Sequence, residues 1–235
     1  MSAPDRPPAD FGELVRSPGV VEELELRSRF GFCAYHGGHL ERQTHIIARE
    51  AAARSGSSYY AVIQPPERVH HIPSTRVDPD ASDRFRSFID HCSVMVTVHG
   101  FGRRGYFTSL LCGGRNRRLA SHVAGHLEST LPHHRAIHDL DDIPKGLRGT
   151  HPRNPCNLTV DGGMQLEVPP RIRGITPAAL HWYRATNGQR FPLLEDLIDA
   201  LAAAAESWPD AAATGEGPSS DEPPAGPTNQ RLPAS

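Results

Sequence analysis

Short apolar runs and helix-like segments alternate through the middle of this chain, and this alternation restricts its fold more than any other feature. Residues 30–35 (FGFCAY) are typical of a buried strand, and residues 41–56 of an alanine-rich helix with Gly56 as its C-cap. The same patterns predict further elements in chain order: a strand at 58–63, a helix at 82–91, a strand at 93–98, a short strand within 103–112, a helix at 116–131, a strand at 164–168 and a helix at 191–208. Such alternation indicates an α/β fold, a single domain with a mixed, mostly parallel sheet and helices on both faces.

Changes in composition mark the limits of this domain. Residues 1–12 are rich in proline, aspartate and alanine, which predicts a flexible leader, and residues 13–30 follow as a helix or a mixed segment. Residues 207–235 are rich in proline and have almost no large apolar side chain, which predicts a disordered tail. The folded domain is therefore expected over residues 13–206.

Charge and hydropathy exclude several classes of partner. The formal net charge is -2, so the chain has no general basic field for nucleic acid. It has no run of about 18 apolar residues for a membrane span, and its first residues lack the apolar core of a signal peptide, so we expect a cytoplasmic protein. The cysteines form no CxxC pair, which argues against a disulfide framework or a cysteine zinc site. Its oligomeric state is left open.

Titratable side chains fall at or near the ends of the predicted strands. His36 follows the first strand, His99 follows a central strand, and Glu167 lies on the strand at 164–168. In open α/β sheets the ligand site lies beyond the carboxyl ends of the strands. Imidazole and carboxylate are the ligands of a catalytic zinc, and three protein ligands leave a position open for water. Glu41 could reach the same ion if the two glycines at 37–38 turn the chain tightly.

Each of these residues also has an ordinary structural explanation. The HGGH segment at 36–39 can be a glycine-rich turn, and either His36 or His39 could then be a ligand. Glu41 can be a charge that the dipole of the following helix favours, His99 a hydrogen-bonded histidine and Glu167 a solvated residue on a strand face. Only the conjunction of these residues supports a metal centre.

Five short motifs give the chain a family resemblance, and they occur in the order HGGHLE (36–41, with Thr44), HIPST (71–75), VHG (98–100), CGGRN (112–116) and GGMQLE (162–167). With these motifs the chain resembles the poly-γ-glutamate hydrolases over roughly residues 25–175. That family consists of zinc enzymes that cut γ-linked polyglutamate and look like shortened zinc carboxypeptidases. The resemblance implies one zinc ion held by His36, Glu41 and His99, and Glu167 as the general base.

The resemblance also implies an acidic peptide or polyglutamate as substrate, and we expect its contacts to come from Thr44, Arg103, Arg115, Asn116 and Asn157. Relatives carry an asparagine-arginine pair just before the GGxQLE strand. Here the arginine position is Leu158, so a cation is missing from its usual place. The arginines that could substitute for it are Arg103, Arg104, Arg115 and Arg153.

The sequence thus predicts a zinc-dependent amide hydrolase that cleaves γ-glutamyl linkages. One alternative is a zinc peptidase or deacylase with a different acyl substrate, which the uncharged Leu158 keeps open. The other alternative is a non-catalytic domain that zinc stabilises. Glu167 argues against this second alternative, because a structural zinc needs no free carboxylate beside an open coordination position.

Overall fold

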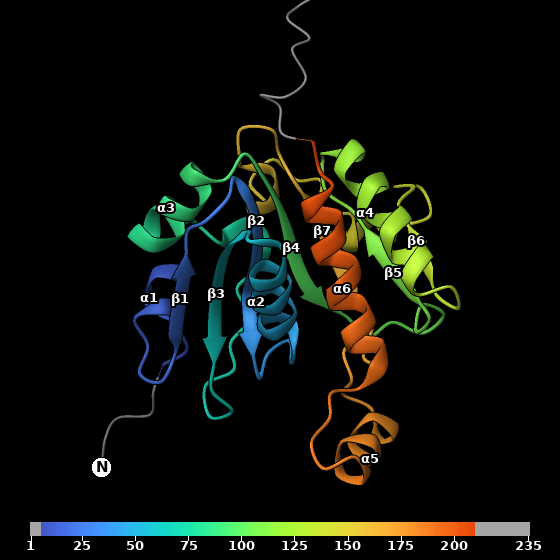
Figure 1. Cartoon of the computed structure of the whole chain (residues 1–235). Coiled ribbons are helices and arrows are strands. Elements are labelled where there is room, and N and C mark those ends of the chain that lie inside the picture. The colour runs from blue at the N-terminus through green and yellow to red at the C-terminus, as the bar shows by residue number, and fades with distance from the viewer. Residues whose placement is uncertain (1–5, 210–235) are drawn as a thin grey trace, which may run out of the picture.

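A seven-stranded mixed sheet forms the centre of the protein, whose computed structural model describes residues 6–209 (Figure 1). Its strands are β1 (Val21–Glu25), β2 (Phe30–Gly38), β3 (Ser58–Gln64), β4 (Val94–Gly100), β5 (Ser109–Cys112), β6 (Arg135–Ile137) and β7 (Met164–Val168). Their order across the sheet is β1-β3-β2-β4-β7-β5-β6. Strands β3, β2, β4 and β7 run parallel, whereas β1 is antiparallel to β3, and β5 is antiparallel to β7 and parallel to β6. The predicted single-domain α/β fold with a mixed sheet is confirmed.

Helices cover both faces of this sheet. They are α1 (Phe11–Val15), α2 (Thr44–Ser55), α3 (Asp83–His91), α4 (Arg117–Thr130), α5 (Pro177–Ala185) and α6 (Pro192–Glu206), with short 3-10 turns η1 (Ser74–Arg76), η2 (Pro79–Ala81), η3 (Lys145–Leu147) and η4 (Pro155–Asn157). Helices α2, α4 and α6 pack together on one face, and α1 and α3 cover the other (Figure 1). Within residues 6–209, no helix combines the length and apolar character that a membrane crossing needs.

Two apolar layers hold the helices against the sheet. On one side, Phe32 and Val96 of the central strands pack with residues of α2, α4 and α6. On the other side, Tyr60 of β3 stacks on Phe85 of α3 with ring centroids 4.5 Å apart. The central strands are therefore buried on both faces, which is why they appear in the sequence as continuous apolar runs.

Strand β6 and helix α5 were not predicted, and the segment at 13–30, expected as a helix or a mixed segment, contains most of α1 and all of β1. Strand β1 (VEELE) is an edge strand, and its charged residues hide the strand pattern because one side of an edge meets solvent. Helix α5 buries only Ala179, and its large apolar residues Leu180, Trp182 and Tyr183 are exposed. Phe11, which falls within the leader predicted at 1–12, belongs to the folded part of the protein, because it lies in α1 and is 1% exposed. Residues 1–5 of that leader and residues 210–235 of the predicted tail lie outside the described residues.

Candidate metal and catalytic site

An irregularity in β2 aims two consecutive side chains at the same place. The pairing of β2 with β3 shifts register between Ala34 and Gly37, and such irregularities redirect side chains that would otherwise alternate between faces. The ring centroids of Tyr35 and His36 consequently lie 4.9 and 5.1 Å from that of His99, which stands near the end of β4. Histidines from two neighbouring parallel strands therefore meet at the carboxyl edge of the sheet.

The glycine loop after β2 folds back toward the sheet and carries Glu41 with it. Gly38 has a φ of +75°, and a Cβ there would lie 2.2 Å from the carbonyl oxygen of Gln64, so no larger residue fits. The Glu41 N–H donates to the His36 carbonyl oxygen at 3.0 Å. The Thr44 hydroxyl donates to the Glu41 carbonyl oxygen at 2.7 Å. Helix α2 begins at Thr44, three residues later than predicted, so Glu41 belongs to the loop rather than to the first helical turn.

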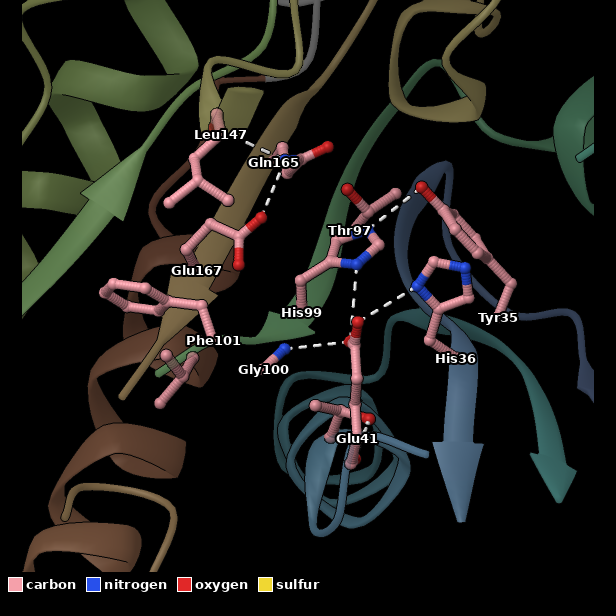
Figure 2. Close-up of polar contacts among 12 residues, drawn as sticks. Tyr35, His36, Glu41, Thr97, His99, Gly100, Phe101, Leu147, Gln165 and Glu167 are labelled. Carbon is pink, nitrogen blue, oxygen red and sulfur yellow. Dashed lines mark hydrogen bonds and ion pairs between the residues drawn. The ribbon is translucent and has the colours of Figure 1, made fainter. Parts of the chain in front are cut away.

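Three side chains converge on one point at this edge. The Nδ1 atoms of His36 and His99 lie 3.0 and 3.3 Å from the two carboxylate oxygens of Glu41 (Figure 2). One ligand atom from each residue can be chosen so that all three lie within 4.8 Å of one another. The Gly100 N–H also donates to Glu41 Oε2 at 2.8 Å, which fixes the carboxylate.

The outer contacts of the two histidines fit a metal ion. His36 Nε2 lies 2.8 Å from the Ile72 carbonyl oxygen, which can only accept, so Nε2 carries the hydrogen. In a neutral ring, Nδ1 would then present a lone pair to the carboxylate of Glu41, 3.0 Å away, and these two acceptors would need a proton or a metal ion between them. His99 Nε2 similarly contacts the Tyr35 hydroxyl at 2.9 Å. Metal-binding histidines are oriented in this way, and a His-Glu-His donor set suits zinc.

The charges of the cluster support the same conclusion. Burial alone would raise the pKa of Glu41, but His99 and His36 hold that pKa well below its usual range. Burial alone would lower the pKa of His99, but the adjacent carboxylate of Glu41 raises it above its ordinary value. The cluster therefore combines an ionised carboxylate with the imidazole of His99, whose protonated form that carboxylate favours.

Glu167 is a buried carboxyl group across the sheet from His99. The two residues are register partners on β7 and β4, and Glu167 is 4% exposed. Burial raises the pKa of Glu167 to about 7, and Glu41 adds to this effect, whereas His99 and a hydrogen bond from Gln165 oppose it. A group with a pKa near 7 can both accept and release a proton at neutral pH, as a general acid–base must.

These groups share one cavity of about 580 Å³, a size that suits a small ligand or one segment of a polymer. Besides His36, Glu41, His99 and Glu167, its lining includes His71, Ser74, Thr75, Phe101, Lys145, His151, Asn154 and Gln165. The sequence analysis had noted the HIPST segment only as a family motif, and the structure brings its residues to the cavity wall. The long connection between β6 and β7 contributes Lys145, His151 and Asn154 to the wall. This connection has no periodic sequence pattern from which its position could be predicted.

A chain of side-chain hydrogen bonds links the buried carboxyl group to the His-Glu-His cluster. Gln165 Nε2 donates to Glu167 Oε1 at 2.8 Å, and Gln165 Oε1 accepts from Asn154 Nδ2 at 2.8 Å. Asn154 Oδ1 accepts from the Tyr35 hydroxyl at 3.4 Å, and this hydroxyl contacts His99. The sequence analysis missed Tyr35, Asn154 and Gln165 as site residues. For Gln165 a signal existed, because it shares a strand face with Glu167 in the GGMQLE motif.

The residues predicted to contact substrate lie elsewhere. None of the five lines the cavity, namely Thr44, Arg103, Arg115, Asn116 and Asn157. Asn116 is the N-cap of α4, and the Asn157 side chain donates to the Gly149 carbonyl oxygen at 2.8 Å. Arg103 and Arg115 are exposed. The structure thus assembles the predicted metal ligands and Glu167 but assigns structural hydrogen bonds to the predicted asparagines and Thr44.

The fold and the cavity define an α/β protein with a buried His-Glu-His cluster and a buried carboxyl group beside it. A family model described as poly-gamma-glutamate hydrolase matches residues 13–184, and the chain belongs to this family of hydrolases. The family that the motifs predicted is therefore confirmed. A search of curated proteins gives no match.

Two solved structures share the fold. A bacteriophage poly-gamma-glutamate hydrolase superposes with a TM-score of 0.66 at 21% identity, covering 82% of this chain and 91% of its own. A zinc-free form of a protein named YNDL superposes with a TM-score of 0.63 at 17% identity, covering 80% of this chain and 90% of its own. The likeness to zinc carboxypeptidases stays a prediction.

Proposed function

We propose that this protein is a zinc-dependent hydrolase that cleaves γ-glutamyl amide bonds in polyglutamate. The observation that carries the proposal is the convergence of His36, Glu41 and His99 with the buried Glu167 in one cavity. The family supports a polyglutamate substrate, and the zinc-free state of YNDL suggests which metal the cluster would hold. A bound zinc ion supplies positive charge that polarises a carbonyl group and lowers the pKa of water.

The residues of the chain have separate roles in this proposal. Glu167 in its ionised form accepts a proton from the attacking water and then donates it to the leaving nitrogen of the amide. Its pKa near 7 suits both steps at neutral pH. Gln165 holds the carboxylate of Glu167 in place. Tyr35 and the Ile72 carbonyl oxygen orient the rings of His99 and His36, so that both Nδ1 atoms face Glu41.

We propose one zinc ion per chain. Among residues 6–209, His36, Glu41 and His99 form the one group of three or more histidine, cysteine, aspartate or glutamate side chains close enough to share an ion. His39, the other candidate in the HGGH segment, is exposed and forms no part of this group. His39→Ala should therefore retain metal at the wild-type ratio, whereas His36→Ala should lose it. Elemental analysis of the two purified variants measures the difference.

The activity test compares γ-linked with α-linked polyglutamate. We expect the zinc-loaded protein to shorten the γ-linked polymer, to lose this activity with a chelator and to regain it with added zinc. Glu167→Gln should keep one zinc per chain while turnover falls by about 10²–10⁴-fold, the usual range for a lost general acid–base group. Cleavage of α-linked peptides alone would favour the peptidase alternative, and a zinc-loaded protein without hydrolysis would favour the binding domain.

A further inference from the structure

Lys145 is the only lysine in the sequence, and it lines the same cavity as the His-Glu-His cluster and Glu167. We propose that Lys145 is a specificity-determining residue whose ammonium group binds a carboxylate of the substrate. This inference rests on the proposed function, because it takes the substrate to be a γ-linked polyglutamate. Three observations support it: the charges of the cavity wall, the anchoring of the turn that carries Lys145, and the absence of a competing partner for the Lys145 ammonium group.

The cavity needs a cation to accept an acidic polymer. Its wall contains the carboxyl groups of Glu41 and Glu167, which repel anions when ionised. Among the described residues of this wall, Lys145 is the one whose side chain carries a full positive charge at neutral pH, since the others are histidines, acids or uncharged residues. Arg173 lies close by, but it is 6% exposed, and its guanidinium donates to the Val168 and Arg42 carbonyl oxygens at 3.0 and 2.9 Å.

The turn that carries Lys145 is fixed relative to the catalytic machinery. Lys145 is the first residue of η3, which the Leu147 N–H closes by donating to the Pro144 carbonyl oxygen at 2.8 Å. The Leu147 carbonyl oxygen accepts from Gln165 Nε2 at 3.3 Å, and the same nitrogen donates to Glu167 (Figure 2). One side chain of β7 thus connects the turn to the proposed general base.

The ammonium group of Lys145 is available to a ligand. Lys145 is exposed, and within residues 6–209 it forms no hydrogen bond or ion pair. A lysine at the edge of a cavity acts as a compact charge on a flexible stem and can follow a carboxylate. The arginines considered from the sequence do not line the cavity, nor does Leu158, which is 37% exposed.

The chemistry of a γ-linked polymer matches this arrangement. Each residue in such a polymer keeps a free carboxylate on the carbon that bears the amide nitrogen, so every scissile bond has a negative charge close to its leaving group. An ammonium group on the cavity wall can pair with this charge while the carbonyl group faces the metal cluster. An α-linked polymer carries its carboxylates at the ends of side chains, at a different distance from the scissile bond.

A kinetic test uses matched variants and a γ-linked glutamate oligomer. At low ionic strength, Lys145→Gln should raise KM by about 3- to 10-fold, the scale of a partly solvated charge pair, with kcat within about twofold. Lys145→Arg should restore most of the affinity, and high salt should reduce the difference between Lys145→Gln and the wild type. Arg153→Gln removes the same charge from the same connection but outside the cavity wall, and it should keep the wild-type KM. An unchanged KM in Lys145→Gln, or an equal rise in Arg153→Gln, overturns the inference.

A labelling test separates this inference from the proposed function. Because the chain has one lysine, an acetylating reagent has two amines to modify, Lys145 and the N-terminal amine. In zinc-loaded Glu167→Gln protein, a γ-linked oligomer should slow acetylation of Lys145 but not of the N-terminal amine, as measured by peptide mass spectrometry. An oligomer with amidated carboxylates should give no protection. Protection by a substrate that the wild type cannot hydrolyse supports the contact and refutes the proposed function, whereas hydrolysis without protection refutes the contact alone.

Discussion

The burial of Glu167 should make the stability of the metal-free protein depend on pH, and one substitution should remove this dependence. Burial raises the pKa of Glu167 from the ordinary value of 4.5 to about 7. At about 1.4 kcal/mol for each unit of pKa, ionising this group in the folded protein costs about 3 kcal/mol more than in the unfolded chain. Below pH 4.5 both states hold the proton and no cost arises. Stability is lost as pH rises between 4.5 and 7, and the full cost is present above this window.

Glu167→Gln keeps the shape of the side chain and the oxygen that accepts from Gln165, but it cannot ionise. In the presence of a chelator, we expect this variant to be more stable than the wild type by up to about 3 kcal/mol at pH 8.5, or about 6–12 °C in Tm. At pH 5 the two proteins should differ by less than about 1 kcal/mol. Urea and thermal unfolding followed by circular dichroism measure both differences.

A matched control isolates the effect of burial. Glu128 is exposed on α4, so Glu128→Gln should change stability by less than about 0.5 kcal/mol at both pH values. Bound zinc places positive charge near Glu167 and favours its ionised form, so the advantage of Glu167→Gln at pH 8.5 should shrink when metal is added. An equal effect of Glu167→Gln at pH 5 and pH 8.5, or a loss of stability at pH 8.5, would refute the reasoning.

Three further substitutions test the cluster and the connection beside it. Glu41→Gln removes the charge that both histidines face, so zinc affinity in a chelator competition assay should fall by at least about 100-fold. A wild-type zinc affinity in this variant would contradict the role of Glu41 as a ligand. Tyr35→Phe removes the oxygen that orients His99, and zinc affinity should fall by about 10- to 100-fold while the unfolding midpoint of the metal-free protein changes little. Gly149→Ala places a Cβ at a φ of +63° and 2.7 Å from Gln165. The free energy of unfolding in urea should fall by about 1–3 kcal/mol, and turnover should fall as well. Wild-type turnover would contradict this prediction.

The sheet and most of its helices could be predicted because their signals are local. Residues 82–91 carry a serine N-cap directly before an amphipathic stretch, and α3 begins at the residue after Ser82. Gly56 ends α2 with a φ of +65°, as its position predicted. Helix α5 was not predicted; Thr176 and Pro177 form a typical helix start, but the helix buries only Ala179 against the rest of the protein.

The positions of the proposed metal ligands could be predicted for a similar reason. His36 and His99 each follow an apolar run, and parallel strands bring such ends together whatever the rest of the chain does. The direction of the His36 side chain could not be predicted, since it depends on the register shift in β2. The place of Lys145 depends on hydrogen bonds between residues distant in sequence, such as that from Gln165 to Leu147, and no local pattern records them.

Gln165 shows why the alternation at 164–168 was easier to detect than to interpret. The pattern placed Gln165 and Glu167 on one face and left open whether this face meets solvent, yet all five residues of β7 are buried. A buried polar face is stable only if its groups find partners, and the amide of Gln165 has three, namely Glu167, Leu147 and Asn154. A glutamate at this position would lose both donor contacts and place a second carboxylate beside Glu167. An amide at position 165 therefore allows β7 to bury a titratable group while keeping that group aligned with the cavity.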